Sequence, residues 1–339
     1  GDFESALAAE SSQTNGTQFN IKSGTTIQLT AEMSGQLGGG TWTQASSQAP
    51  LVFRGYDSVK NDGGRFEIVC ATNTSAWQHA TMSHVSFVDG YIRDSGTATL
   101  IDGGNFFQLI NMEFSGASAT YAVLLDSYAR TINCNFHDLA TPVAYYTLSQ
   151  AWNSFNFYDK VSQVGGYIGG VHDHCIFYET NLSIATDSLA LRVANCSFLG
   201  NGTTSGIYCP VTRTQSGTIL NCLFENLTQG VFMNMSSVNG GENTLPAIIS
   251  GNSFFNCTTN IVYEHANLFE GNETLSASPF EKTGLPTFAN RQNYFAPANE
   301  GNVRIGGYSP TGAPVTRGAI PFFGLGGTGG TYNPHPLLG

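Results

Sequence analysis

A repeat with a period near 21 residues limits the fold of this chain more than any other feature of its sequence. Three segments share the frame Asn-Cys-x-Phe, at residues 129–138, 191–200 and 217–226. Weaker copies extend the series, whose anchoring aromatic residues are Phe87, Phe114, Phe136, Phe157, Phe177, Phe198, Phe224 and Phe254. The steps between these residues are 27, 22, 21, 20, 21, 26 and 30 positions. Self-similarity at such a period indicates a solenoid.

The local pattern within each repeat predicts the kind of solenoid. Short β-prone pieces such as Ala122–Leu125 and Gly230–Met233 are separated by Gly, Asn, Ser and Thr. Only 11% of the residues are charged, so long helices with charged outer faces are not expected. We therefore predict an all-β fold, a right-handed parallel β-helix of about 10 coils with roughly three strands in each coil. We also expect a short N-terminal cap and an irregular C-terminal tail.

The chain divides into four parts on this interpretation. Residues 1–50 are expected to form the cap, with a helix-like piece at 2–10, and the first coils. The body follows at 51–276, a closing segment at 277–321, and a Gly-rich tail at 322–339. Because a solenoid exposes unpaired strand edges at its ends, we expect this tail to dock on a neighbouring subunit, giving oligomers or a filament. The alternative is that it folds back along its own solenoid.

Alignment of the coils on the Phe residues predicts which side chains face inward. The position two residues earlier shares the same face of the strand, and it holds Cys134, Cys175, Cys196 and Cys222. These cysteines are predicted to be inert core thiols. The position three residues earlier is rich in Asn, which tolerates a left-handed backbone, and is predicted to be a sharp turn. The position five residues earlier forms another inward column, in which the alignment places Thr131, Trp152 and His172.

Charge and hydropathy exclude two classes of partner. The chain has 13 basic and 24 acidic residues and a formal net charge of −11, which opposes binding to the phosphate backbone of nucleic acids. No apolar stretch approaches the 18 residues that a membrane-spanning helix needs.

The Asn-Cys-x-Phe coils resemble those of the right-handed parallel β-helix, or pectin-lyase-like, superfamily. Two further stretches resemble secreted bacterial and phage-associated members of that group: APLVFRGYDSVKNDGGR at 49–65, and VTRGAIP at 315–321, which is placed like a closing motif. The resemblance implies a location that is secreted, extracellular, or on a cell or virion surface. It does not imply one activity, because this scaffold carries lyases, hydrolases, epimerases, adhesins and tail spikes.

The catalytic patterns of these enzymes are missing from the sequence. It lacks the Asn-Thr-Asp, Asp-Asp, Gly-His-Gly and Arg-Ile-Lys elements of polygalacturonases, the Arg-x-Pro-x-x-Arg element of pectate lyases and the Asp-Pro-His of alginate epimerases. We therefore expect a non-enzymatic structural or adhesive subunit that assembles with itself or binds polysaccharide. The alternative is a polysaccharide lyase or glycoside hydrolase that acts on one face of the β-helix.

The candidate site for that alternative lies two residues after the Phe anchors. Asp138, Asp159 and Glu179 fall there on three successive coils, where stacked carboxylates could bind Ca²⁺ or provide acid–base catalysis. The competing interpretation is a turn column in which Asp alternates with Asn. Beside it, His137, Tyr158 and Tyr178 are predicted either to stack outward as a sugar-binding platform or simply to cover the sheet.

The sequence His172-Asp173-His174 is the remaining site-like cluster. A His-x-His pair can bind a metal ion, and His172 is also a weak catalytic candidate. However, His172 falls in the inward column and His174 falls in the turn column, which predicts that they point apart. A buried His172 without a metal is therefore the favoured interpretation, and no metal site is expected.

Overall fold

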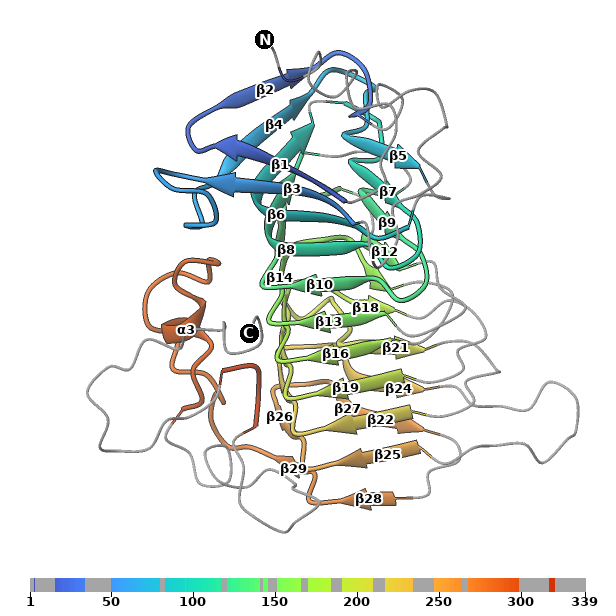
Figure 1. The fold of residues 1–339 in the computed structure, drawn as a ribbon. Helices are drawn as coiled ribbons and strands as arrows, with labels where there is room; N and C mark the ends of the chain where they lie inside the picture. The colour runs from blue at the N-terminus through green and yellow to red at the C-terminus, as the bar shows by residue number, and fades with distance from the viewer. Residues whose placement is uncertain are drawn as a thin grey trace, which may run out of the picture.

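The fold is known from a computed structural model of the chain. It describes Phe3 and residues 16–33, 50–79, 83–94, 96–116, 121–140, 143–145, 151–165, 170–183, 191–209, 217–233, 247–263, 268–298 and 317–320. The described chain is almost entirely β-structure, which confirms the all-β prediction. Its strands pair in parallel with the strands of the preceding and following coils, as in a β-solenoid (Figure 1).

The strands form three stacks, which we call faces A, B and C. Face A contains β1 (Thr17–Lys22), β3 (Leu51–Tyr56), β10 (Arg130–Ile132), β13 (Trp152–Ser154), β16 (Val171–Asp173), β19 (Leu191–Ala194), β22 (Gly217–Leu220), β25 (Ala247–Ser250) and β28 (Leu268–Glu270). Face B contains β2 (Thr26–Leu29), β4 (Phe66–Cys70), β11 (Asn135–His137), β14 (Phe157–Asp159), β17 (Ile176–Tyr178), β20 (Ser197–Leu199), β23 (Leu223–Glu225), β26 (Ser253–Phe255) and β29 (Glu273–Thr274). Face C contains β5 (Trp77–His79), β7 (Ile101–Gly103), β9 (Val123–Leu125), β12 (Val143–Tyr145), β15 (Val164–Gly165), β18 (Leu182–Ser183), β21 (Ile207–Cys209), β24 (Gln229–Met233) and β27 (Thr259–Tyr263). Two long strands, β6 (Val85–Asp94) and β8 (Gln108–Ser115), run across both A and B.

A column of stacked rings on face B forms the centre of the interior. It runs through Phe114, Phe136, Tyr158, Phe177, Phe198, Phe224 and Phe254, which pair one coil after another. Neighbouring ring centroids lie 4.5–5.2 Å apart, and all seven side chains are buried. The thiols of Cys134, Cys175, Cys196 and Cys222 are also buried and free. The repeat therefore builds a continuous apolar core.

The turn between faces A and B uses one residue with a left-handed backbone in each coil. Asn111, Asn133, Asn195, Asn221 and Gly251 hold this position with φ between 52° and 66°. The side-chain amides bond from coil to coil, since Asn133 Nδ2 donates to Asn111 Oδ1 at 2.8 Å and Asn221 Nδ2 donates to Asn195 Oδ1 at 3.4 Å. Asn suits this position because it tolerates positive φ and because its side-chain amide can form hydrogen bonds with the Asn of the neighbouring coil.

The coil at 151–165 departs from the predicted alignment by one residue. Tyr158, not Phe157, joins the interior ring column, and Asn153, not Trp152, faces inward on face A. A buried hydrogen-bond network joins the polar side chains that this shift brings inside: Asn156 Nδ2 donates to Thr131 Oγ1 at 2.6 Å, and Thr131 Oγ1 donates to Asn153 Oδ1 at 2.7 Å. Phe157 consequently points out of the solenoid.

A C-terminal segment covers the outward side of face B next to Phe157. This segment comprises residues 276–298, with the short helix α3 (Arg291–Tyr294), and residues 317–320. Phe280, Phe295 and Ala319 form a second apolar cluster with outward residues of face B, namely Phe157, Ile176, Leu199 and Leu223. In Figure 1 the α3 region lies beside the strand stack, below the blue N-terminal strands.

Polar contacts hold the C-terminal segment on this face. Arg317 is 3% exposed, and its guanidinium pairs with Glu273 and donates to Ser253 Oγ and to the carbonyl oxygen of Gly271. Ala319 N donates to Ser197 Oγ at 2.9 Å. The motif predicted to close the chain therefore contributes to the cover of face B.

Two predictions about the ends of the chain lie mostly outside the described residues. Of the predicted cap at 2–10, only Phe3 is described, and its ring lies 6.2 Å from Phe19 and 6.4 Å from Phe53. The tail at 322–339 is outside the described residues altogether. Within the described part of the chain, no helix has the length and apolarity needed to cross a membrane.

Candidate functional site

The apolar cluster of the C-terminal segment packs on only part of face B. The strands of face B that lie closer to the N-terminus carry a polar cluster on their outward side. We call it the His137 surface, and define it as Arg65, Tyr91, Glu113, Ser115, His137 and Asp159. The register explains the grouping, because Tyr91 pairs with Glu113 and His137 pairs with Asp159 on neighbouring strands of face B. Alternation along each strand directs these side chains outward while Phe114, Phe136 and Tyr158 point inward.

His137 lies between two carboxylates. Its Nε2 is 2.9 Å from Glu113 Oε1, and its Nδ1 is 2.8 Å from Asp138 Oδ2. Arg65 Nη2 donates to the other oxygen of Glu113 at 2.8 Å. The Tyr91 ring stacks on the imidazole with a centroid distance of 6.4 Å. The four groups fix the orientation of the imidazole on an otherwise flat sheet.

Asp159 is the incompletely bonded member of the His137 surface. Its Oδ1 is buried and has no hydrogen-bond partner among the described residues. Its strand neighbours are His137 on one side and Tyr178 on the other, and the Tyr178 ring packs against Phe295 of the C-terminal segment at 6.3 Å. A buried carboxylate oxygen without a donor is uncommon in folded proteins, so Asp159 keeps unused acceptor capacity at this surface.

The environment shifts the pKa values of these groups in different directions. Hydrogen bonding to Glu113 raises the pKa of His137 above its usual value, and the same bond lowers the pKa of Glu113. Burial raises the pKa of the Asp159 carboxyl. The surface thus combines an ionised carboxylate, a stabilised imidazolium and a carboxyl that holds its proton more tightly than usual.

The predicted column of Asp138, Asp159 and Glu179 is not formed. Asp138 and Glu179 do occupy the turn after face B, with φ of 51° and 46°, but the residue between them in that column is Lys160, with φ of 54°. The one-residue shift of this coil moves Asp159 back into β14, beside His137. The lysine therefore separates the two carboxylates, as in the turn-column interpretation, and Asp159 belongs to a different group.

The predicted sugar platform is only partly outward. Tyr158 is fully buried, and its ring stacks between Phe136 and Phe177, so its assignment as an exposed residue is wrong. His137 and Tyr178 do face outward from β11 and β17, but they are separated by Asp159 rather than by Tyr158. Burial and the neighbouring Glu179 raise the pKa of Tyr178 to about 12.

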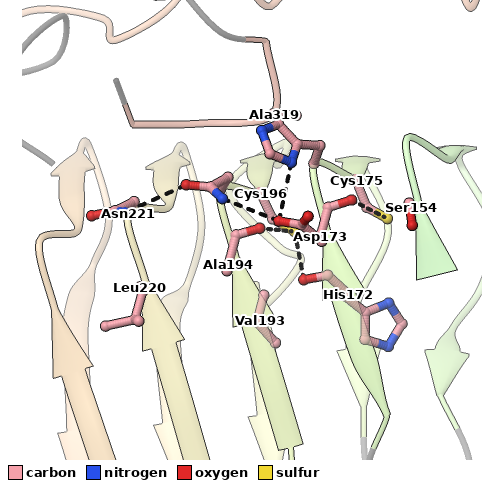
Figure 2. Close-up of polar contacts among 12 residues, drawn as sticks. Ser154, His172, Asp173, Cys175, Val193, Ala194, Cys196, Leu220, Asn221 and Ala319 are labelled. Carbon is pink, nitrogen blue, oxygen red and sulfur yellow. Dashed lines mark hydrogen bonds and ion pairs between the residues drawn. The ribbon is translucent and has the colours of Figure 1, made fainter. Parts of the chain in front are cut away.

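His172 lies in the interior and is separated from the surface groups of its own motif. Figure 2 shows its imidazole directed away from Asp173, whose carboxylate lies within bonding distance of Asn195. Burial lowers the pKa of His172 to about 3, and His174 stands at the A–B turn with φ of 54°. The two histidines point apart, so they cannot bind one ion together, and an interior His172 cannot meet a polymeric substrate.

The described part of the chain contains no cluster of side chains that is arranged as a metal site. No set of three or more His, Cys, Asp or Glu side chains there is arranged to hold a metal ion. A bound Ca²⁺ stays a prediction.

Sequence reasoning missed Arg65, Tyr91 and Glu113. Tyr91 falls in a coil whose sequence anchor is wrong, since Ile92, not Phe87, pairs with Phe114. Arg65 lies before the first anchor, and Glu113 lies one residue before Phe114, outside the aligned columns. The available signal was the odd spacing of 27 residues between Phe87 and Phe114, because the true partner Ile92 lies 22 residues before Phe114.

Comparison of the chain with protein-family models gives no match, and comparison with curated proteins and with solved structures gives none either. The class defined by the observations is an all-β solenoid with a polar, His-centred surface on one face.

The titration of His137 should report its ion pair with Glu113. We expect an imidazole pKa above 6.5 by NMR, and a fall toward that value in Glu113→Gln, because the substitution removes the charged acceptor. His172 provides an internal control, since its buried ring should not titrate above about pH 4. An unchanged His137 pKa in the variant would contradict the pairing.

The same shifts predict how this pair contributes to stability with pH. The raised pKa of His137 means that its stabilisation is complete below 6.5 and is lost as the pH rises through the folded-state value. The lowered pKa of Glu113 means that its stabilisation is present above 4.5 and is lost as the pH falls. The pair therefore stabilises the fold most between these two limits.

Proposed function

We propose that this chain is a right-handed parallel β-helix of the pectin-lyase-like kind, and that it is a non-enzymatic, extracellular or virion-surface subunit that binds polysaccharide through the His137 surface. The single observation that carries the binding proposal is Oδ1 of Asp159, which is buried without a partner among the described residues. We also propose that the subunit assembles with itself. This proposal is supported by the unpaired strand edges at the ends of a solenoid, which pair with other chains unless they are capped.

The chemistry of the His137 surface suits a carbohydrate. Sugars present hydroxyl groups that donate to carboxylates, and hydroxyl oxygens that accept from Arg and His. Arg65 has a side chain that is 50% exposed and keeps further N–H donors, whereas Glu113 is 21% exposed and already doubly bonded. Tyr91 and Tyr178 add aromatic surface on either side of His137 and Asp159. The N–H groups that Arg65 does not use for Glu113 can pair with an acidic group of a glycan.

Binding can be measured with oligosaccharides that differ in charge. We expect an acidic linear oligosaccharide to bind the parent protein, and Asp159→Asn to weaken it about tenfold, because the amide replaces one acceptor oxygen by a donor. Glu270→Gln is the matched control, since Glu270 is exposed at the end of β28, outside the His137 surface, and the substitution makes the same change in charge. An equal loss in both variants would assign the effect to net charge and overturn the role of Asp159.

A second candidate function is a glycoside hydrolase or polysaccharide lyase on the same surface. The observation in its favour is that Glu113 has a lowered pKa and Asp159 a raised one, the pattern by which two carboxyl groups take the roles of base and acid. Their strands, β8 and β14, are separated by β11 alone, about 9.6 Å in the stack, and Glu113 is level with Phe157, two residues before Asp159. The two side chains would therefore have to lean toward each other to reach the roughly 6.5–9.5 Å between the carboxyl groups of inverting hydrolases.

Product analysis separates the two functions. Incubation with acidic and neutral polysaccharides should give no new reducing ends and no unsaturated products if the protein only binds. Turnover that is abolished by Asp159→Asn or Glu113→Gln would instead support the enzyme and reject the non-enzymatic proposal.

A further inference from the structure

The turn between faces C and A carries a ladder of aromatic rings in three successive coils. His84 precedes β6, Phe106 precedes β8 and Tyr128 precedes β10. The His84 and Phe106 ring centroids lie 4.6 Å apart with an interplanar angle of 15°, and those of Phe106 and Tyr128 lie 4.9 Å apart with an angle of 7°. The rings therefore form a straight row along the axis of the stack.

The backbone at all three positions is left-handed. The φ angles are 59°, 56° and 61° for His84, Phe106 and Tyr128, a region that bulky residues rarely adopt because it costs conformational free energy. The A–B turn uses mostly Asn and Gly for the same conformation. Aromatic side chains are therefore not what the turn itself requires.

Exposure distinguishes this ladder from a ring pair at the left-handed A–B turn. Phe155 and His174 stack at 5.1 Å on the A–B turn, but neither is among the exposed large apolar side chains. Phe106 is 41% exposed and Tyr128 is 48% exposed. Stacking alone does not explain rings that remain nearly half in solvent on two successive coils.

Polar side chains and a third exposed ring adjoin the ladder on face A. Gln108, Arg130 and Trp152 pair with one another on consecutive strands. Trp152 is 48% exposed, and its Nε1 donates to Ser154 Oγ at 2.7 Å, which fixes the indole. We call these six residues the aromatic strip: His84, Phe106, Gln108, Tyr128, Arg130 and Trp152.

We propose that the aromatic strip binds a linear neutral glycan laid along the axis of the solenoid. The faces between the ladder rings are taken up by stacking, so sugar C–H groups would pack against the exposed ring edges and against the indole of Trp152. Sugar hydroxyls would bond to guanidinium and amide groups such as those of Arg130 and Gln108. The linear row of rings, repeated once per coil, matches an extended chain of repeating units. This inference extends the polysaccharide binding proposed above to a second surface, and in that sense it rests on the proposed function.

Other occupants fit the strip less well. A peptide cannot add to the sheet here, because β8 is already paired with β6 and with β10 on its two sides. Nucleic acid is opposed by the net charge of −11 and by Asp102 and Asp126 on the preceding part of these coils, where burial and the Asp126 charge raise the pKa of Asp102. A lipid surface would leave Arg130 and Gln108 in an apolar environment.

The test uses Phe106→Asn combined with Tyr128→Asn. Asn tolerates left-handed φ, so we expect the double variant to fold with an unchanged or higher melting temperature. Its affinity for linear neutral hexasaccharides with β-1,4-linked glucose or xylose units should fall about tenfold in calorimetric titration. Binding should also shift the fluorescence of exposed Trp152 in the parent protein. Phe155→Asn is the matched control, since it makes the same substitution at the A–B turn, and it should bind like the parent.

The outcomes separate this inference from the proposed function. Loss of neutral-glycan binding in the double variant, with binding retained in Asp159→Asn, supports the aromatic strip. Binding within twofold of the parent in the double variant overturns it, as does failure of the parent to bind either neutral hexasaccharide. Loss of acidic-glycan binding in Asp159→Asn alone supports the His137 surface whatever the strip variants do.

Discussion

Replacing Phe198 with alanine is expected to lower the free energy of unfolding by about 3–5 kcal/mol. The ring is fully buried in the middle of the interior column, with centroids of Phe177 and Phe224 at 4.5 Å and 4.8 Å. Removing it takes away the contacts of both neighbours and leaves a cavity, because stacked coils cannot collapse independently to fill it. Urea unfolding followed by circular dichroism measures the loss.

Leu285→Ala is the matched control for this experiment. Leu285 is 71% exposed, so its truncation should change stability by less than about 0.5 kcal/mol. If Phe198→Ala also costs less than about 1 kcal/mol, the ring does not belong to a packed interior, and the stacked register of face B is wrong.

Replacing Arg317 with methionine is expected to release the C-terminal segment from face B. The guanidinium is buried against Glu273, Ser253 and Gly271, and breaking such a pair from one side typically costs about 3–5 kcal/mol because the partner is left uncompensated. We expect this loss to be local. Amide hydrogen exchange should rise in residues 276–298, and proteases should cleave there first, while the strand stack stays protected.

Arg93→Met is the control for this effect. Arg93 also forms an ion pair with a glutamate, Glu67, at 2.8 Å, but its side chain is 43% exposed. Exposed pairs contribute less than about 1 kcal/mol, so exchange in the C-terminal segment should not change. Equal exchange in the Arg317→Met variant and the parent would show that Arg317 does not hold the segment.

The C-terminal segment connects stability to the candidate site. Phe295 packs on both Phe157 and Tyr178, and Tyr178 is the strand neighbour of Asp159. Release of the segment would therefore expose Asp159 from one side. The Arg317→Met variant should weaken binding at the His137 surface if burial of Asp159 contributes to recognition, and this can be measured in the titration proposed above.

Much of the stack could be predicted from the sequence, because each coil repeats one local pattern. Asn at the A–B turn follows from the left-handed backbone there, and the inward columns of Cys and Phe follow from strand alternation two residues apart. Such rules act within one coil and between its neighbours, so they need no knowledge of distant parts of the chain.

The position of Asp159 in the His137 surface depends on which of two adjacent aromatic residues faces inward, and the local sequence pattern does not decide this. Phe157 and Tyr158 are adjacent aromatic residues, and either could satisfy an inward position by hydropathy. The choice of Tyr158 rests on the buried Asn156 side chain, whose amide donates to Thr131 Oγ1 and to the Tyr158 hydroxyl. This one-residue shift also takes Asp159 out of the predicted carboxylate column and places it beside His137.

An all-β stack with a Phe- and Cys-lined interior follows from the order of the amino acids, because a short repeat specifies its own neighbours. The outward direction of Phe157 does not follow from it, since the residues that cover this ring, Phe288 and Phe295, lie more than a hundred positions away. The contact of Glu113 with both Arg65 and His137 does not follow from that order either. These residues come from different coils, and parallel stacking brings them together only after the register of every intervening strand has been fixed.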